Sequence, residues 1–483
     1  MNEQVNAPLF NPRSPEFIRN PYPHYERLRT TDAMHLTSLG MYVASRHAEA
    51  SLVLRDKRFG MDYVERTIRR YGPKIMNEPL FRGLRRWMLH QDPPDHTRLR
   101  GLFVKAFTAR RVEDMRPRIQ QIVDETLDGM IPQGRMDLIE DFAFRLPVTI
   151  ICDMLGIPDE HREMFYADAR ESGHVLDPVT LSPKQIKQGN VRALMSARYC
   201  RQLFELRRRK PGNDLTTQLV QAEEDGRKLS NEELTANLIL LFGAGHETTV
   251  NLIGNGLLAL HRNPDQLALL KANPSLITNA IEEFLRYDSA FQVTGRVALE
   301  DIEDLGGKEI PKGDSVLCLL GSANHDSAVY PDHPERLDIT RPNVKPLSFG
   351  GGIHFCLGAQ LARIEAEIAI STLLRRLPDL RLDDAENPEW RPTFALRGVK
   401  RLPASWGRHS SAGWRCDFAT LASIYERFRR RVRLGANAAG APKRRHRADD
   451  AARIGDRLHH RADSRARRAV FHRLEPVPPA IRG

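Results

Sequence analysis

A glycine-rich segment with one cysteine is the part of the chain best suited to chemistry. Residues 349–358 read FGGGIHFCLG. Three consecutive glycines disfavour helix and strand, and they let the backbone lie close against a flat or bulky group. Residues 359–369 carry apolar side chains at helical spacing, which predicts a helix directly after Cys356. Amide groups at that helix start would favour negative charge on the sulfur and shift the thiol towards thiolate.

Two other interpretations of Cys356 have to be weighed. A free cysteine is most often a small buried hydrophobic residue. Zinc ligation is disfavoured because His354 and Cys356 are too close in sequence for a usual pair of ligands, and no Cys-x-x-Cys pair accompanies them. Taken alone, the segment is therefore compatible with a structural cysteine.

A second unusual segment lies within a long predicted helix. Ser230 and Glu233 form a capping-box pattern, and no proline follows until Pro264, so a helix is predicted over residues 231–262. Its middle is apolar on nearly all sides and leads into GAGHETT at residues 243–249. Glycines, a carboxylate and hydroxyls are costly in a buried helix. A close helix crossing would explain the small residues, but the polar ones favour a functional segment.

Both segments resemble motifs of the cytochrome P-450 family. The pattern Phe-x-x-Gly-x-His-x-Cys-x-Gly over residues 349–358 is similar to the family's haem-binding loop, in which a cysteine thiolate ligates the iron. Ala-Gly-x-Glu-Thr-Thr over residues 244–249 resembles the family's oxygen-binding helix. The resemblance implies a mainly α protein with the cytochrome P-450 fold, in which residues 1–407 form a large helical domain with a small β-rich region.

The resemblance also implies a site for haem b, iron protoporphyrin IX. Cys356 would be the metal ligand and Phe349 would pack near its sulfur. His96 and Arg100 lie four residues apart and share one helical face. Without a haem they would read as a solvated basic stripe, but they match a His-x-x-x-Arg pair of the family that meets the haem propionates. The predicted cofactor-binding residues are His96, Arg100, Ala244, Arg296, Phe349, His354, Cys356 and Gly358.

Glu247 and Thr248 are the residues that the resemblance assigns to catalysis. Reduction of dioxygen consumes protons, and a buried site has no bulk water beside it. Thr248 is expected to donate a hydrogen bond near the reacting oxygen, and Glu247 is expected to pass protons inward. The neighbouring Thr249 is expected to face helix packing instead.

Other segments are assigned structural roles. Glu283 and Arg286 match the family's Glu-x-x-Arg, which is expected to pair with Arg336 of a later Pro-Glu-Arg. Strands are predicted at residues 34–36, 41–44, 291–299 and 313–320, and helices at residues 112–131, 138–155, 160–174 and 182–210. The last two helices and their loop are expected to roof the substrate pocket. A hairpin at residues 390–399 is expected to dip into that pocket with its tip, residues 394–396.

The function implied is that of a haem-thiolate monooxygenase acting with O2 on a small apolar substrate. A ferredoxin and an NAD(P)H-dependent ferredoxin reductase are the expected electron donors, and Arg98, Arg110, Arg111 and Arg363 are candidates for docking the acidic partner. Two alternatives stay open. One is a haem-thiolate peroxygenase or isomerase, which Glu247 and Thr248 argue against, since such reactions need no delivered protons. The other is a non-enzymatic haem sensor or nucleic-acid-binding protein.

Composition limits these alternatives. No run of 18 apolar residues occurs, the N-terminus lacks a secretory pattern, and five scattered cysteines do not form a disulfide framework, so a cytoplasmic protein without a membrane segment is expected.

Residues 408–483 hold 19 basic and 7 acidic residues, against 54 and 55 in the rest of the chain. This composition predicts a disordered tail. Translation in a shifted frame would explain it better than nucleic-acid binding.

Overall fold

The computed structural model describes residues 9–38, 40–169, 180–224 and 227–407. The basic tail predicted over residues 408–483 and most of the loop predicted between the two roof helices lie outside these ranges. Within the described ranges, no helix combines the length and the apolar character that crossing a membrane requires.

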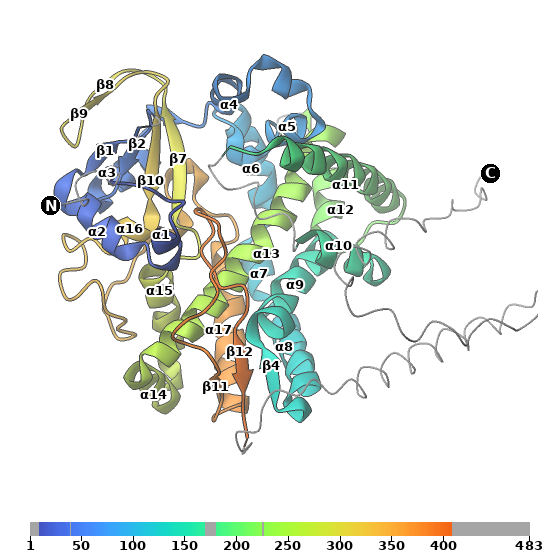
Figure 1. Cartoon of the computed structure of the whole chain (residues 1–483). Coiled ribbons are helices and arrows are strands. Elements are labelled where there is room, and N and C mark those ends of the chain that lie inside the picture. The colour runs from blue at the N-terminus through green and yellow to red at the C-terminus, as the bar shows by residue number, and fades with distance from the viewer. Residues whose placement is uncertain (1–8, 39, 170–179, 225–226, 408–483) are drawn as a thin grey trace, which may run out of the picture. The chain divides into compact units, whose positions relative to one another are not determined.

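Helix α13 (Asn231–Arg262) runs through the middle of the helical part (Figure 1), with the predicted bounds. The Ser230 hydroxyl accepts a hydrogen bond from the Glu233 amide at 3.1 Å, and the Glu233 carboxylate accepts one from the Ser230 amide at 2.9 Å. The predicted capping box therefore starts the helix. Every residue from Thr249 to Leu260 is buried, as expected for a helix surrounded by protein.

Several helices pack around α13 and hold it in place. α13 contacts α9 (Arg145–Leu155), α15 (Ile277–Tyr287) and α17 (Ala359–Arg376), and α17 in turn contacts α8 (Arg116–Met130). A Cβ atom at Gly256 would lie 2.8 Å from the Phe284 ring, so glycine is what lets α15 approach α13 closely. The leucine, isoleucine and phenylalanine side chains of these helices form the largest core cluster.

The remaining helices complete the helical part. They are α1 (Pro15–Arg19), α2 (Tyr22–Thr31), α3 (His47–Arg55), α4 (Tyr63–Tyr71), α5 (Pro79–Leu84), α6 (Asp95–Ala106), α7 (Ala109–Glu113), α10 (Arg162–Ala169), α11 (Pro183–Arg209), α12 (Leu215–Gln221), α14 (Pro264–Ala272) and α16 (Leu320–Ala323). The 3-10 turns are η2 (Pro73–Asn77), η3 (Met88–His90), η4 (Ile131–Gln133), η6 (Asp159–His161), η8 (Pro274–Leu276), η9 (Leu347–Phe349) and η10 (Gly352–His354), and η5 (Leu138–Ala143) is a π-helix.

The β structure is small and its main sheet carries one predicted site residue. Five strands follow the order β1-β2-β10-β7-β3, namely β1 (Met34–Leu36), β2 (Tyr42–Ala44), β10 (Ser315–Leu319), β7 (Val293–Ala298) and β3 (Phe59–Gly60). Arg296 of β7 pairs with Val316 of β10. The remaining strands are β11 (Arg381–Leu382), β12 (Pro403–Ser405) and β4 (Arg135–Asp137) in one sheet, β5 (Glu223–Glu224) with β6 (Arg227–Lys228), and β8 (Ile302–Leu305) with β9 (Lys308–Ile310). A mainly α fold with a small β-rich region is therefore confirmed.

The hairpin predicted at residues 390–399 is present in a reduced form, but its tip does not lie in the pocket. Trp390 and Val399 form an antiparallel bridge, and the Arg391 amide donates to the Gly398 carbonyl at 2.9 Å. A second bridge joins Leu396 to Phe291. Phe394 does not enter a pocket. Its ring packs against Phe10 and Phe17, with centroids 5.6 and 5.8 Å apart, because this apolar tip is covered by the N-terminal segment of the chain.

The predicted partner of the Glu283–Arg286 pair is also wrong. Arg286 and Glu283 are fully buried and form two hydrogen bonds of 2.7 Å. The second arginine at Glu283 is Arg341, at 3.4 Å, whereas the Arg336 side chain is 70% exposed and lies beside Glu335. Arg336 joins the network through its backbone carbonyl, which accepts a hydrogen bond from Arg286 at 2.8 Å.

Candidate active site

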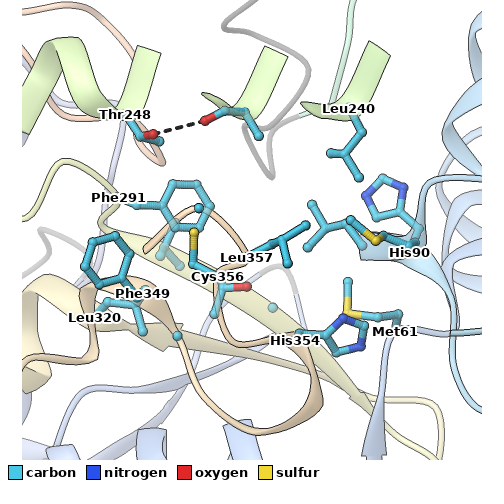
Figure 2. A pocket seen from close by; sticks show the side chains of 18 of the residues that line it. Met61, His90, Leu240, Thr248, Phe291, Leu320, Phe349, His354, Cys356 and Leu357 are labelled. Carbon is cyan, nitrogen blue, oxygen red and sulfur yellow. Dashed lines mark hydrogen bonds between the residues drawn. The ribbon is translucent and has the colours of Figure 1, made fainter. Parts of the chain in front are cut away.

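A cavity of about 390 Å³ lies between α13, the main sheet and the cysteine loop. Figure 2 shows the Cys356 sulfur pointing towards Thr248, which lies across the pocket on α13. Most of the other walls are apolar. They include Met61, Phe81, Leu84, Met88, Leu181, Leu240, Leu241, Phe291, Val293, Leu320 and Leu361. All eight residues predicted to bind the cofactor line this cavity, Phe349 included.

The cysteine loop is held in shape by its own backbone. The Cys356 amide donates to the Phe349 carbonyl at 3.0 Å, and α17 begins at Ala359. Gly352 adopts φ +64°, and a Cβ atom there would collide with the Leu54 carbonyl. Glycine is therefore required at this position because the loop lies directly against α3.

The pKa of the Cys356 thiol is shifted in the direction opposite to the one that the sequence predicts. Burial raises its pKa, and this effect outweighs the amide of Gly358 and the charges of Arg100 and Arg363, which lower it. The sulfur still has accessible surface, because it lines the cavity. The start of a helix is therefore not enough to lower the pKa of this thiol below its ordinary value.

Four of the predicted cofactor-binding residues, His96, Arg100, Arg296 and His354, lie together on one side of the cavity. The rings of His96 and His354 are 4.3 Å apart, and Arg100 donates to the Phe355 carbonyl at 2.6 Å. His96 Nδ1 and His354 Nε2 are buried and have no hydrogen-bond partner among the described residues. Burial lowers the pKa of both histidines, with further lowering from nearby cations. Two unsatisfied ring nitrogens beside two arginines fit an anionic group.

Arg296 points to the same conclusion. Its side chain is 3% exposed and donates to the Gly295 carbonyl at 2.9 Å, and burial lowers its pKa. Among the described residues no carboxylate forms an ion pair with it. A buried guanidinium without a counter-charge is costly, so an anion at this position would remove that cost. These residues therefore fit a group with acidic substituents.

Thr248 and Glu247 face different surroundings although they are consecutive in α13. Thr248 lines the cavity, and its hydroxyl donates to the Ala244 carbonyl at 3.0 Å, as drawn in Figure 2. Glu247 is buried and does not belong to the described cavity lining. Its carboxylate lies 3.7 Å from Arg391, in the C-terminal loop. Thr249 is buried, as predicted, but it also contributes to the lining.

Sequence reasoning missed several groups. Arg391 was not anticipated, because its contact with Glu247 joins residues far apart in the chain. Arg66 of α4 and His90 of η3 also line the cavity. Burial lowers the pKa of His90 to about 3, and its ring stacks on Tyr63 with centroids 4.1 Å apart. No local pattern marks these residues as parts of a site.

The predicted docking cations are partly neutralised. Arg98 forms an ion pair with Glu233, and Arg363 forms one with Glu282. Arg111 donates to Asn213 at 3.0 Å. Arg110 is exposed, and the described residues offer it no ion-pair partner. Arg98 and Arg363 are therefore neutralised by carboxylates, and of the other two arginines Arg110 is the more exposed.

Comparison with known proteins identifies the family. The family model described as Cytochrome P450 matches residues 193–396. The chain is 42% identical over 401 residues to cytochrome P450 107B1 of Saccharopolyspora erythraea, covering 81% of this chain and 96% of that protein. It is 41% identical over 409 residues to the cytochrome P450 monooxygenase PikC of Streptomyces venezuelae, covering 83% and 94%.

A solved structure agrees with these matches. P450BioI, in complex with an acyl carrier protein ligated to hexadec-9Z-enoic acid, is 39% identical, with a TM-score of 0.75 and coverage of 81% of this chain and 99% of that one. Fold, motifs and similarity agree over the same part of the chain. The chain therefore belongs to the cytochrome P450 family, and it is a haem-binding monooxygenase of that family.

Proposed function

We propose that Cys356 would ligate the iron of a bound haem b and that the cavity would hold a small apolar substrate beside it. The observation that carries this proposal is the place of the cysteine. Of the four described cysteines, Cys356 alone lines the cavity, whereas Cys152, Cys200 and Cys318 are buried elsewhere. When bound, the haem supplies reductive activation of O2, with one oxygen atom entering the substrate and the other leaving as water.

The chain's own residues have three tasks in this proposal. His96, Arg100, Arg296 and His354 bind the propionates, which satisfies the two unpartnered ring nitrogens and the buried Arg296 charge. Ala244, Phe349 and Gly358 contact the cofactor through their places in the lining. Thr248 donates a hydrogen bond towards the reacting oxygen, and Glu247 supplies the protons that pass through that hydroxyl.

Substrate and partners follow from the walls and from the relatives. Apolar side chains dominate the lining, which suits hydroxylation of an apolar molecule. P450BioI was solved with an acyl chain, and an acyl chain would suit the same walls. We expect electrons from a separate ferredoxin and its NAD(P)H-dependent reductase, with Arg110 among the docking cations, and we expect the protein to act in the cytoplasm.

The carbon monoxide spectrum of the reduced protein tests the ligand. The wild-type chain should give the red-shifted band of a thiolate haem. Cys356→His should keep part of its haem and lose that band, and Cys200→Ala, which changes a buried cysteine outside the cavity, should keep it. A red-shifted band in Cys356→His would refute the assignment.

A further inference from the structure

A row of polar side chains runs along α13 away from the active site. Glu247, Asn251 and Asn255 are spaced four residues apart, so they follow one face of the helix at steps of about 6 Å. Asn251 is 1% exposed and Asn255 is 3% exposed. Both lie in the stretch of α13 where every residue is buried. Apolar residues would be expected at these positions.

Several polar atoms in this row have no partner among the described residues. They are Asn251 Oδ1, Asn251 Nδ2, Asn255 Oδ1 and Arg391 Nε, all buried. A buried polar group without a hydrogen bond costs free energy, so native proteins rarely leave several of them next to one another. Ordered water molecules are the usual partners of such groups.

The C-terminal loop forms the other side of the row. Arg391 lies 3.7 Å from the Glu247 carboxylate, and the Arg397 carbonyl accepts from Asn255 Nδ2 at 3.0 Å. Between them, a Cβ atom at Gly398 would collide with Asn251 Oδ1, so the loop backbone lies directly beside Asn251. The loop and the helix face thus enclose the row along its length.

The far end of the row opens into a second cavity. Asn255 lines a polar cavity of about 1210 Å³ that shares no lining residue with the active-site cavity. Its walls include Tyr22, Asp288, Arg262 and Arg397. Trp390 and Pro392, the neighbours of Arg391, also line it. A cavity of this size and polarity holds water.

We propose that this row is the route by which protons reach Glu247 from the second cavity. Water molecules bridge Asn255 to Asn251 and Asn251 to Glu247, with Arg391 Nε holding the inner water. Along these steps of about 6 Å, neighbouring waters also contact one another beside the Asn251 side chain, so a proton moves from water to water and the asparagine amides only hold the waters in place. A proton from water in the cavity passes along these waters and protonates the Glu247 carboxylate, and Glu247 then donates a proton towards Thr248 and becomes a carboxylate again. Each cycle moves protons inward without any change of oxidation state in the row.

This inference rests on the proposed role of Glu247, and the experiment separates the two. The haem-loaded full chain is assayed with NADPH, ferredoxin, ferredoxin reductase and myristic acid as the probe substrate. Asn251→Leu has nearly the shape of asparagine but breaks the row, so NADPH-coupled turnover should fall about tenfold. The solvent deuterium isotope effect should rise. Asn251→Ser leaves room for water and should restore most of the rate.

A matched control lies on the same helix. Asn237 is buried in α13, but all its polar atoms are bonded, to Met88, Arg86 and Glu233 at 2.7–3.0 Å. Asn237→Leu should leave the isotope effect unchanged. A normal rate and isotope effect in Asn251→Leu, with slow turnover in Glu247→Gln, would overturn the route alone. Normal values in Glu247→Gln as well would overturn the role of Glu247.

A second readout needs neither substrate nor turnover. If water fills the row, Asn251→Leu displaces it and leaves Asn255 and Arg391 unsatisfied, so the Tm of the haem-loaded protein should fall, with Asn251→Ser closer to wild type. If the row is dry, Asn251→Leu removes two unsatisfied groups and the Tm should rise. A higher Tm in Asn251→Leu would overturn the proposal whatever the turnover assay gives.

Discussion

At the scale of single residues, Cys356 shows how local and global effects on one group compete. The start of α17 and the Gly358 amide favour negative charge on the sulfur, as the sequence predicts. Burial has the larger effect and raises the pKa of the thiol. Burial depends on residues such as Thr248 and Leu320 that are distant in sequence, so the local pattern could not predict the direction in which the pKa of this thiol is shifted.

Arg296 and the two histidines beside it give a test of cofactor retention. Arg296→Ala should weaken haem binding by roughly tenfold to hundredfold, because hydrogen bonds to charged groups contribute about 1.5–3 kcal/mol. Transfer of haem to an excess of apomyoglobin measures the loss. Arg336→Ala removes an arginine that is 70% exposed and should transfer haem at the wild-type rate. Equal transfer from Arg296→Ala and wild type would remove Arg296 from the site.

Thr248 and Thr249 both line the cavity, so their roles need a direct comparison. The Thr248 hydroxyl bonds the Ala244 carbonyl in the same helix, and it is the group we expect to control proton transfer. Thr248→Ala should keep NADPH consumption within about twofold of wild type while most reducing equivalents appear as hydrogen peroxide. Product and peroxide yields per NADPH measure this coupling. Uncoupling in Thr249→Ala but not in Thr248→Ala would exchange the two roles.

At the scale of elements, prediction succeeded where the signals are local. The bounds of α13 follow from a capping box, an uninterrupted apolar run and a proline just beyond its end, and all three signals lie in the helix or directly next to it. The position of the tip of the segment at residues 390–399 could not be predicted from local signals. Its conformation depends on Phe10, Phe17 and Glu247, which come from other parts of the chain. An exact match to a family motif also gave the wrong partner for Glu283. The motif indicated Arg336, but the second charge that meets Glu283 comes from Arg341.

The buried network of α15 predicts a clear difference between those two arginines. Arg341 is 7% exposed, contacts Glu283, and donates to the carbonyls of Asp332 and His333. Arg341→Ala should lower the free energy of unfolding by about 3 kcal/mol, because it leaves buried acceptors and a carboxylate unsatisfied. Arg336→Ala should change it by less than about 0.5 kcal/mol. Urea unfolding of both variants decides the matter, and a larger effect of Arg336→Ala would restore the original assignment.

At the scale of the whole molecule, the C-terminal strand β12 completes the described fold. β12 pairs with β4 and β11, the Trp406 indole donates to the Ile131 carbonyl at 3.2 Å, and the Gly407 amide donates to Asp379 at 2.8 Å. Truncation after Gly407 should therefore leave the Tm and the carbon monoxide spectrum unchanged. Truncation before Pro403 removes β12 and should prevent folding. A loss of haem on removing residues 408–483 would give the basic segment a structural role.

Acid stability is a property of the whole molecule to which its buried histidines should contribute, and His325 is one of them. His325 stacks on Tyr22 with ring centroids 4.4 Å apart, and its Nε2 lies 2.9 Å from the Tyr287 carbonyl. Burial lowers its pKa from 6.5 to about 3, and Arg286, Arg29 and Arg341 add to that effect. The folded protein therefore keeps this ring neutral where the unfolded chain protonates it.

The sign of the effect follows from proton binding. Between pH 6.5 and about 3, His325 is protonated in the unfolded chain but neutral in the folded one. Its contribution to the free energy of unfolding is therefore fully present above pH 6.5 and is lost as the pH falls below that value. From pH 6.5 to 4.5 this histidine should lower the free energy of unfolding by roughly 2 kcal/mol. His325→Gln, which does not titrate, should therefore lose less stability than wild type over this range. Urea unfolding of the haem-loaded protein at several pH values measures the difference, with His333→Gln, a 65% exposed position, as the control. Parallel stability curves for His325→Gln and wild type would show that His325 does not set the acid limit of the fold.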